Sequence, residues 1–341
     1  MKLSRSAAAA PRATLPSLRG RVTDWSRTAP SAPVFKALLV VFALAWLVVS
    51  LDGGSFLTVD NVVNMLQRSV ALGLVAVGQT LVILAGSLDL SVAYLISLSS
   101  LVGASTMEDG GLVVGVAAAL GVGVLVGLAN GLVITKLKVN AFIATLGMAL
   151  ILKGVIDFYW DGPAGAVTEG FESFGYTRFG PVPASVLLLA VVVGLAWLLL
   201  HGTRFGSSLY SVGGSEEVSK LSGVRTDRVK IAAHILCSVA AALTGLFLAS
   251  RLGSGTPLVG TDGGYDLESI AAVVLGGTAL AGGRGGVIGT LGGVLLLAVL
   301  DNAFNQLEVD SFLKDVVRGA IIIAAVALYA RRSRQAGELT S

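Results

Sequence analysis

Cysteine and histidine are both scarce in this sequence. Among its 341 residues there is one cysteine, Cys237, and there are two histidines, His201 and His234, which lie far apart along the chain. A single cysteine excludes a disulfide framework within the chain. No pattern of acids accompanies either histidine in the way that a metal site requires, so we expect neither a metal nor another cofactor.

Charged side chains are also few. They make up 13% of the sequence, whereas hydrophobic residues make up 54%, a balance far from that of a soluble globular protein. The formal net charge is only +3, which gives no support for a large nucleic-acid-binding surface. Aromatic residues are sparse at 6%, but glycine is abundant with 44 residues, as in tightly packed membrane helices. We therefore predict a membrane protein.

Long apolar runs dominate the rest of the sequence. A helix needs about 20 residues to cross a bilayer, whereas the alternating strands of a membrane barrel are about 10 residues long. Runs of the first kind predict an all-α polytopic membrane protein with about ten transmembrane helices. The predicted spans cover 34–51, 67–86, 90–106, 111–134, 140–158, 183–201, 230–250, 267–281, 286–302 and 314–330.

Lysine and arginine predict the orientation of these spans. They gather near both ends of the chain and in the loop at about 202–229, whereas the loops that alternate with these carry acids. Basic loops stay on the cytoplasmic side, so both termini are predicted to be cytoplasmic. We expect residues 1–33 to form a disordered basic tail, residues 34–330 the transmembrane domain, and residues 331–341 a second cytoplasmic tail.

Three short pieces of the first half recur, in the same order, in the second half. The pairs are LKVNAF at 137–142 with LEVDSF at 307–312, LANG at 128–131 with LDNA at 300–303, and LDLS at 88–91 with YDLE at 265–268. The members of each pair lie five predicted spans apart, and an odd separation inverts their orientation in the membrane. This pattern indicates an inverted internal repeat, a common plan of transporters. The alternative is that helix ends share short capping patterns.

The long basic loop contains a segment with the signals of a short helix. In GGSEEVSKLSGVRTDRVK, at 213–230, Ser215 suits the helix cap, two acids follow in the first turn, and Gly223 comes where the helix would stop. Val218 and Leu221 can share one face. A helix of about two turns is marginal alone, so we expect it to dock into a groove on a partner protein.

This segment resembles the coupling-loop signature of ABC importer permeases of the ribose and simple-sugar class, whose usual form is a glycine followed by NEEAARLSGI and RVK. The resemblance covers most of residues 55–330 in family order. The other matching motifs are SLDLSV, NAFIATLGM, LASRLGSG and YDLESIAAVVLGGTALAGGRGGVIGTLGGV. Ser215 replaces the usual asparagine, Val218 and Ser219 replace an alanine pair, and Asn140 replaces a frequent proline, which leaves the substrate open.

The resemblance implies a transport subunit rather than an enzyme. It also implies a multi-pass protein of the plasma (inner) membrane. Its expected partners are a cytoplasmic ABC ATPase, an extracytoplasmic sugar-binding protein, membrane lipid and a second copy of the permease, most simply as a homodimer. The sequence contains no G-x-x-x-x-G-K-[ST] phosphate loop, so ATP hydrolysis belongs to the partner. The substrate implied is a ribose-like monosaccharide.

Two sets of residues are candidates for function. The set implied by the resemblance for ATPase coupling is Gly213, Gly214, Ser215, Glu216, Glu217, Leu221 and Gly223. The set of polar or aromatic residues in or beside the spans, which are candidates for the translocation path or its gates, is Asp89, Asn130, Asn140, Phe142, Thr145, Asp266 and Asn302. A neutral sugar needs hydrogen-bonding groups but no fixed charge along its path. The alternative for the second set is hydrogen bonding between helices.

Asp89 illustrates the two interpretations. It stands at a predicted break between two spans, where an acid favours the start of the following helix. If Asp266 is its inverted counterpart, the two acids mark matching helix starts at opposite mouths of the path. The glycines at 275–286 leave a similar choice between a short or broken helix and close helix packing.

Two other functions remain open from the sequence. A related class of ABC permeases moves branched-chain amino acids, and the coupling segment alone does not exclude it. An inverted repeat also suits a self-sufficient secondary transporter. The docking helix and the scarcity of embedded carboxylates for proton relays disfavour that second alternative.

Overall fold

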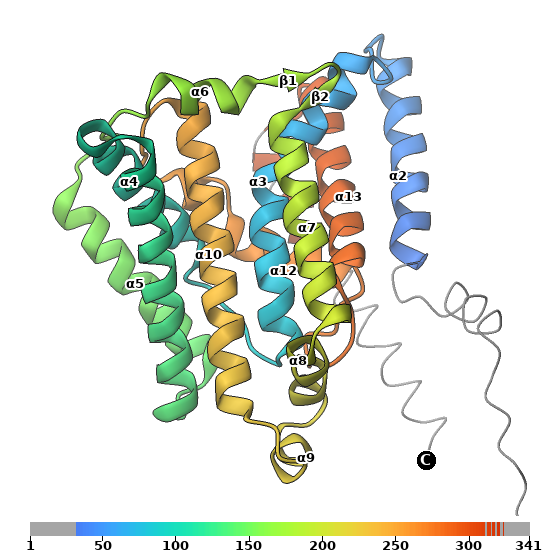
Figure 1. Cartoon of the computed structure of the whole chain (residues 1–341). Coiled ribbons are helices and arrows are strands. Elements are labelled where there is room, and N and C mark those ends of the chain that lie inside the picture. The colour runs from blue at the N-terminus through green and yellow to red at the C-terminus, as the bar shows by residue number, and fades with distance from the viewer. Residues whose placement is uncertain (1–31, 311, 315, 318, 321–322, 324–341) are drawn as a thin grey trace, which may run out of the picture.

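The computed structural model describes residues 32–310, 312–314, 316–317, 319–320 and 323. Among these residues, seven helices are long and apolar enough to cross a membrane. They are α2 (Ala32–Leu51), α3 (Val59–Leu84), α4 (Val92–Lys136), α5 (Ala141–Tyr159), α7 (Ala184–Gly202), α10 (Thr226–Leu252) and α13 (Val287–Gln306). The helices stand side by side as a bundle (Figure 1), so the prediction of an all-α polytopic membrane protein is confirmed.

Helix α4 contains two arms. The backbone turns at Gly111, whose φ of 78° and ψ of 178° are not helical. The arms pack against each other, because a Cβ atom on Gly103 would lie 3.3 Å from the Cβ of Ala119, and one on Gly115 only 2.6 Å from the Cβ of Met107. The spans expected over 90–106 and 111–134 correspond to these two arms.

Helix α12 (Tyr265–Leu275) differs from the expectation of a span over 267–281. Its 11 residues extend for about 16 Å, which is too short to cross a bilayer. The chain then continues without a helix until α13, with positive φ angles at Gly277, Gly282 and Gly283. The glycine-rich segment therefore ends a short helix, which is one of the two alternatives that the sequence left open.

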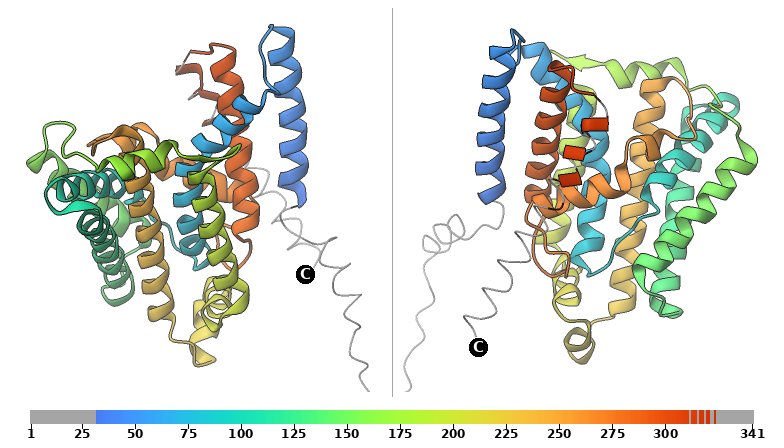
Figure 2. Two further views of the ribbon diagram at one scale, coloured as in Figure 1. Left: turned by 45° about the horizontal axis from the view of Figure 1, so that its top comes forward. Right: turned by 180° about the vertical axis from the view of Figure 1, so that it is seen from behind.

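The centre of the bundle is formed by α3 and α10. Helix α3 is buried over most of its length, and α10 packs against both α3 and α4. Gly78 allows a close approach of α3 to α10, since a Cβ atom there would lie 2.9 Å from the Cα of Cys237. Helix α2 lies at the edge of the bundle and packs against α13, as both views in Figure 2 show.

Short elements cover the two ends of the bundle. One end carries α6 (Glu169–Tyr176) and an antiparallel pair of two-residue strands, β1 (Arg178–Phe179) and β2 (Val182–Pro183). The opposite end carries α8 (Arg204–Gly214) and α9 (Glu216–Leu221) (Figure 1). A further short helix, α11 (Val259–Asp262), precedes α12. We call these the α6 end and the α9 end; the sequence predicts that the α9 end is cytoplasmic.

Several sequence predictions extend beyond the described residues. Nearly all of the N-terminal tail predicted over 1–33 lies outside them, as does the tail predicted over 331–341. The last predicted span, 314–330, lies mostly outside them as well. The count of ten spans and the cytoplasmic position of both termini therefore stay predictions.

Candidate functional site

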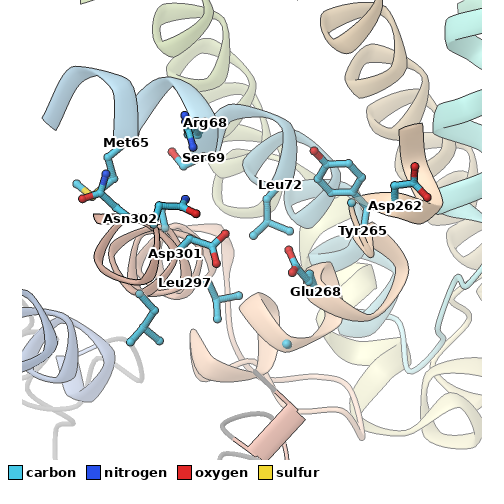
Figure 3. A pocket seen from close by; sticks show the side chains of 15 residues that line it. Met65, Arg68, Ser69, Leu72, Asp262, Tyr265, Glu268, Leu297, Asp301 and Asn302 are labelled. Atoms are coloured by element: carbon cyan, nitrogen blue, oxygen red, sulfur yellow. The ribbon is translucent and has the colours of Figure 1, made fainter. Parts of the chain in front are cut away.

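A cavity of about 240 Å³ lies near the α6 end, between α3, α12 and α13. We call it the outer cavity. The residues that line it with polar side chains are Arg68, Ser69, Asp262, Tyr265, Glu268, Asp301, Asn302 and Asn305. Figure 3 shows the carboxylates of Glu268 and Asp301 directed into the space between the three helices. Hydrogen-bond acceptors and donors thus meet at one place.

The charges in the outer cavity were not anticipated. We expected a path without fixed charge, but Arg68, Glu268 and Asp301 all line this cavity. Each lies near the end of an apolar run in the sequence, where a charged residue is ordinary, so no local signal distinguishes it. Only the packing of three helices brings the charges together. Glu268 and Asp301 each also contact other groups of the protein.

Asn302 lines the outer cavity, and it also joins two helices. Its side-chain nitrogen donates to Asn61 Oδ1 over 2.8 Å, and Asn61 Nδ2 donates to Asn302 Oδ1 over 3.0 Å. Asn302 Oδ1 also accepts a hydrogen bond from Gln306. This reciprocal pair of hydrogen bonds between side-chain amides holds α13 against the start of α3. Both interpretations of Asn302, path and interhelical contact, are therefore compatible with its position.

Asp266 does not line the outer cavity. Its Oδ1 accepts a hydrogen bond of 2.9 Å from the backbone nitrogen of Leu267 at the beginning of α12. This is the role of an acid at a helix start, which the sequence predicts as the structural alternative.

A buried polar cluster lies toward the other end of the bundle. Asp89 Oδ1 accepts hydrogen bonds from the backbone nitrogen and from Oγ of Ser91, over 3.0 and 2.5 Å. Asn130 Nδ2 donates to Ser91 Oγ over 3.0 Å and lies 3.4 Å from Asp89 Oδ2. His234 Nδ1 lies 3.3 Å from Asp89 Oδ2, and its Nε2 lies 2.9 Å from Ser87 Oγ. All five side chains are at most 4% exposed.

The structure gives Asp89 a partner that the sequence did not indicate. Its carboxylate does hydrogen-bond near the start of α4, as expected for an acid at a helix start, but it is fully buried and shares a contact with a histidine on a distant helix. Sequence reasoning paired Asp89 with nothing on α10. A histidine within an apolar run, His234, was the one available signal, since such a side chain needs a polar partner when it is buried.

Three further candidates lie at the turn between α4 and α5. Asn140 caps α5, because its Oδ1 accepts a hydrogen bond of 2.9 Å from Phe142 N. Thr145 Oγ1 donates to the backbone oxygen of Ala141 over 2.9 Å and lies 3.4 Å from that of Leu88. Phe142 is 49% exposed and takes no part in the buried cluster. Of these three residues, Thr145 is the one with a contact to Leu88, the residue before Asp89.

A second cavity, of about 270 Å³, opens beside this turn. We call it the inner cavity. It is lined by Ser87, by Lys138 and Asn140 of the α4–α5 turn, by Glu216 of α9 and by Lys230 of α10. The buried cluster therefore reaches the α9 end of the bundle through Ser87.

Helix α9 forms as the sequence predicts. Ser215 Oγ accepts a hydrogen bond of 3.3 Å from Val218 N, and the chain leaves the helix at Gly223, whose φ is 82°. Leu221 is 90% exposed and Val218 is 61% exposed. This six-residue helix therefore presents two exposed apolar side chains at the α9 end of the bundle.

The glycines before α9 differ in importance. A Cβ atom on Gly213 would lie only 1.8 Å from the backbone oxygen of Leu84, so no other residue fits. At Gly214, nothing lies within 4 Å of such an atom. Of the two predicted coupling glycines that precede α9, only Gly213 is required by packing.

Glu216 ties α9 to the rest of the bundle. It forms an ion pair with Lys220 on α9 over 2.6 Å and another, shorter contact with Lys230 on α10. Hydrogen bonds from Lys220 and then from Lys230 lower the pKa of Glu216 from its ordinary value of 4.5 to about 2. The carboxylate is therefore charged throughout the physiological range. The adjacent acid, Glu217, has no such partner in the hydrogen bonds and ion pairs described.

The two similar motifs LKVNAF and LEVDSF adopt similar turns. Lys138 has a φ of 57° and Glu308 a φ of 51°, and these are the two non-glycine residues with positive φ in the described part of the chain. Asp310 Oδ1 accepts a hydrogen bond of 2.8 Å from Phe312 N, as Asn140 does from Phe142 N. Backbone geometry thus agrees with the sequence similarity of these two segments.

Comparison with known proteins gives a consistent result. A family model described as "Branched-chain amino acid transport system / permease component" matches residues 61–326. "Ribose import permease protein RbsC" of Escherichia coli strain K12 is 42% identical over 296 residues, covering 85% of this chain and 90% of that protein. The protein of the same name from Bacillus subtilis strain 168 is 41% identical over 295 residues, or 84% and 90%. "L-arabinose transport system permease protein AraH" of E. coli K12 is 36% identical over 291 residues, or 85% and 88%. No solved structure matches the chain.

Proposed function

Since the chain belongs to the family described as branched-chain amino acid transport system permease components, we propose that it is the membrane-spanning permease subunit of an ATP-driven importer for a simple sugar. The observation that carries the choice of a sugar is the similarity, over most of both chains, to permeases named for ribose and arabinose. A permease of this kind works with an ATPase and a solute-binding protein. Its own contribution is the path and the mechanical link, without bond chemistry.

The outer cavity is the part of the path that we assign to the sugar. Its volume of about 240 Å³ equals that of about eight water molecules, which is enough for a small monosaccharide. Sugar hydroxyls can donate to the carboxylates of Glu268 and Asp301 and accept from Arg68. Asn302 and Asn305 add neutral hydrogen-bonding groups on the same wall. A ligand with many hydroxyl groups matches such a mixture of acceptors and donors.

Helix α9 is the part that we assign to the ATPase. Its exposed Leu221 and Val218 suit insertion into an apolar groove, in the way that amphipathic helices dock. The set of predicted coupling residues around it spans Gly213 to Gly223. Closure of the ATPase pair on ATP would then displace α9 and open or close the path in alternation.

We also propose that the two halves of the chain form an inverted repeat and that two copies of the chain pair in the membrane. Support for the repeat comes from the matching turns at Lys138 and Glu308. In the described part of the molecule, one turn follows the second arm of α4 and the other follows α13. In the proposed repeat, α13 is the counterpart of that arm. Such a repeat provides two similar gates on opposite sides of one path.

Transport by the reconstituted complex tests the proposed function. The chain, its ATPase and the sugar-binding protein would be placed in liposomes, and uptake of labelled ribose, arabinose and leucine would be measured with and without ATP. We expect uptake of a sugar that needs ATP and the binding protein. Uptake of leucine alone, or saturable sugar uptake by the chain without an ATPase, would contradict the proposal.

A matched pair of variants tests the role of α9. Leu221→Glu places a charge on the exposed apolar face and should abolish ATPase binding, measured by co-purification. His201→Ala, at the end of α7, serves as the control and should leave ATPase binding unchanged. Equal binding by both variants would remove α9 from the docking surface.

A further inference from the structure

The segment between α3 and α4, residues 85–91, is irregular, and yet its polar residues are buried. Its charged residue, Asp89, and the hydroxyls of Ser87 and Ser91 are almost completely excluded from solvent. A buried polar segment needs partners that hold it in place, because unpaired polar groups inside a protein are costly. Those partners identify the helices that are in contact with this segment.

Helix α10 supplies the main partner outside α4. The ring of His234 lies between Ser87 and Asp89, with one nitrogen 2.9 Å from Ser87 Oγ and the other 3.3 Å from Asp89 Oδ2. A single side chain thus contacts the segment at two points. Any shift of His234 along or around α10 must displace these contacts.

The same face of α10 leads to the coupling helix. Lys230 lies four residues before His234, and residues at this spacing share one face of a helix. Lys230 pairs with Glu216, the first residue of α9. Glu216, Lys230 and Ser87 all line the inner cavity. Polar contacts therefore join α9 to one end of a turn of α10 and the buried segment to the other end of the same turn.

A second contact with the segment comes from α8, the helix that precedes α9 in the chain. Gly213, near the end of α8, packs directly on the backbone oxygen of Leu84, where α3 ends. Its Cα would lie 3.8 Å from a Cβ on Gly86. The residues that precede α9 and the helix that follows it both touch the chain between Leu84 and Asp89. The chain before α9 and the chain after it are therefore both in contact with this segment.

We propose that residues 85–91 are the moving part of the inner gate, and that His234 is the positioning residue that makes them follow α9. The proposal rests on the assignment of α9 to the ATPase. ATP-driven displacement of α9 shifts Lys230 through Glu216, α10 carries His234 with it, and His234 moves Ser87 and Asp89. Polar contacts connected through a rigid helix can carry coupling between sites, and mutation of the residues involved measures that coupling.

The test is the number of sugar molecules imported per ATP hydrolysed by the complete complex in liposomes. In His234→Ala we expect this ratio to fall at least fivefold, while ATP hydrolysis stimulated by the binding protein stays within twofold of the original protein. His234→Gln, which keeps a side-chain donor toward Asp89, should retain more of the ratio. His201→Ala, a change of the other histidine of the chain, should leave it unchanged.

Pairs of variants test the link itself. If Lys230 and His234 act in one chain of contacts, Lys230→Met combined with His234→Ala should lower the ratio no further than the stronger single variant does. Effects that multiply would show that the two residues act independently and would overturn the link. A parallel loss of uptake and ATP hydrolysis, with an unchanged ratio, would show that His234 has a structural role only.

The design separates this inference from the proposed function. If the original complex imports no sugar, the proposed function fails. If it imports sugar and His234→Ala keeps the ratio, only the role of His234 fails. Should His234→Ala not assemble, as judged by co-purification and thermal unfolding, the same ratio in His234→Gln decides: a fall below the original protein supports the role of His234, and an unchanged ratio overturns it.

Discussion

Lys138 and Glu308 adopt the same left-handed backbone conformation in two turns whose sequences are alike, LKVNAF and LEVDSF. This conformation is uncommon for residues other than glycine and asparagine, because the Cβ atom crowds the neighbouring carbonyl oxygen. Two such residues at equivalent places are stronger support for an inverted repeat than shared capping letters are. The two turns share a positive φ angle at this position, although the side chains that adopt it, lysine and glutamate, differ.

The first prediction concerns these two turns. Lys138→Val and Glu308→Val place a β-branched side chain in the left-handed region and should each lower stability by about 1–2 kcal/mol. Lys138→Asn and Glu308→Asn are the controls and should be nearly neutral, since asparagine tolerates this conformation. Thermal unfolding of the purified proteins in detergent measures the difference. If valine is harmless in one turn and harmful in the other, the turns are not equivalent.

The second prediction concerns the outer cavity. Glu268→Gln and Asp301→Asn remove a carboxylate without changing its size, and a hydrogen bond to a charged group contributes about 1.5–3 kcal/mol. Sugar uptake at low concentration should therefore fall about 10- to 100-fold. Asp266→Asn is the matched control, because Asp266 stands on the same helix but does not line the cavity.

Uptake by reconstituted complexes checks this second prediction, with thermal unfolding to confirm that the variants are folded. An uptake defect in Asp266→Asn as large as that in Glu268→Gln would contradict the assignment of the sugar path to the outer cavity. Full uptake in both cavity variants would do the same.

The third prediction compares two adjacent glycines. In Gly213→Ala the new methyl group would overlap the backbone oxygen of Leu84, so the variant should lose stability by at least about 1–3 kcal/mol or fail to assemble. Gly214→Ala meets no atom within 4 Å and should be neutral or slightly stabilising. The apparent melting temperatures of the two variants provide the comparison, and similar values would refute the close packing at Gly213.

The fourth prediction concerns acid. Because the pKa of Glu216 is lowered from 4.5 to about 2, its ion pairs stabilise the folded protein fully above pH 4.5. This contribution should be lost as the pH falls from about 4.5 toward about 2. In Glu216→Gln the contribution is absent at every pH. The melting temperatures of the two proteins should therefore differ by a constant amount above pH 4.5 and converge in acid.

A difference in melting temperature that persisted unchanged at pH 2 would show that the ion pairs of Glu216 are not the cause. Lys220→Met provides a further comparison. It removes one ion-pair partner of Glu216 but keeps the other, Lys230. At neutral pH its melting temperature should therefore lie between those of the original protein and Glu216→Gln.

Local features of this protein could be predicted well. Helix α9 begins at Ser215 and ends before Gly223 because caps act within a few residues, and the spans follow from hydropathy along single helices. The span over 267–281 was predicted too long for a related reason. Apolar composition measures burial, and α12 is buried among other helices without crossing the membrane as a full helix.

The sequence by itself determined that this chain is an all-α membrane protein with a short capped helix after Ser215, because hydropathy and capping depend on neighbouring residues. Only the tertiary structure decided which distant side chains meet. His234 joins Asp89, and Arg68 joins Glu268 and Asp301 around one cavity. Such meetings depend on the direction and register with which helices pack, and residues far apart in the chain carry no local record of that packing.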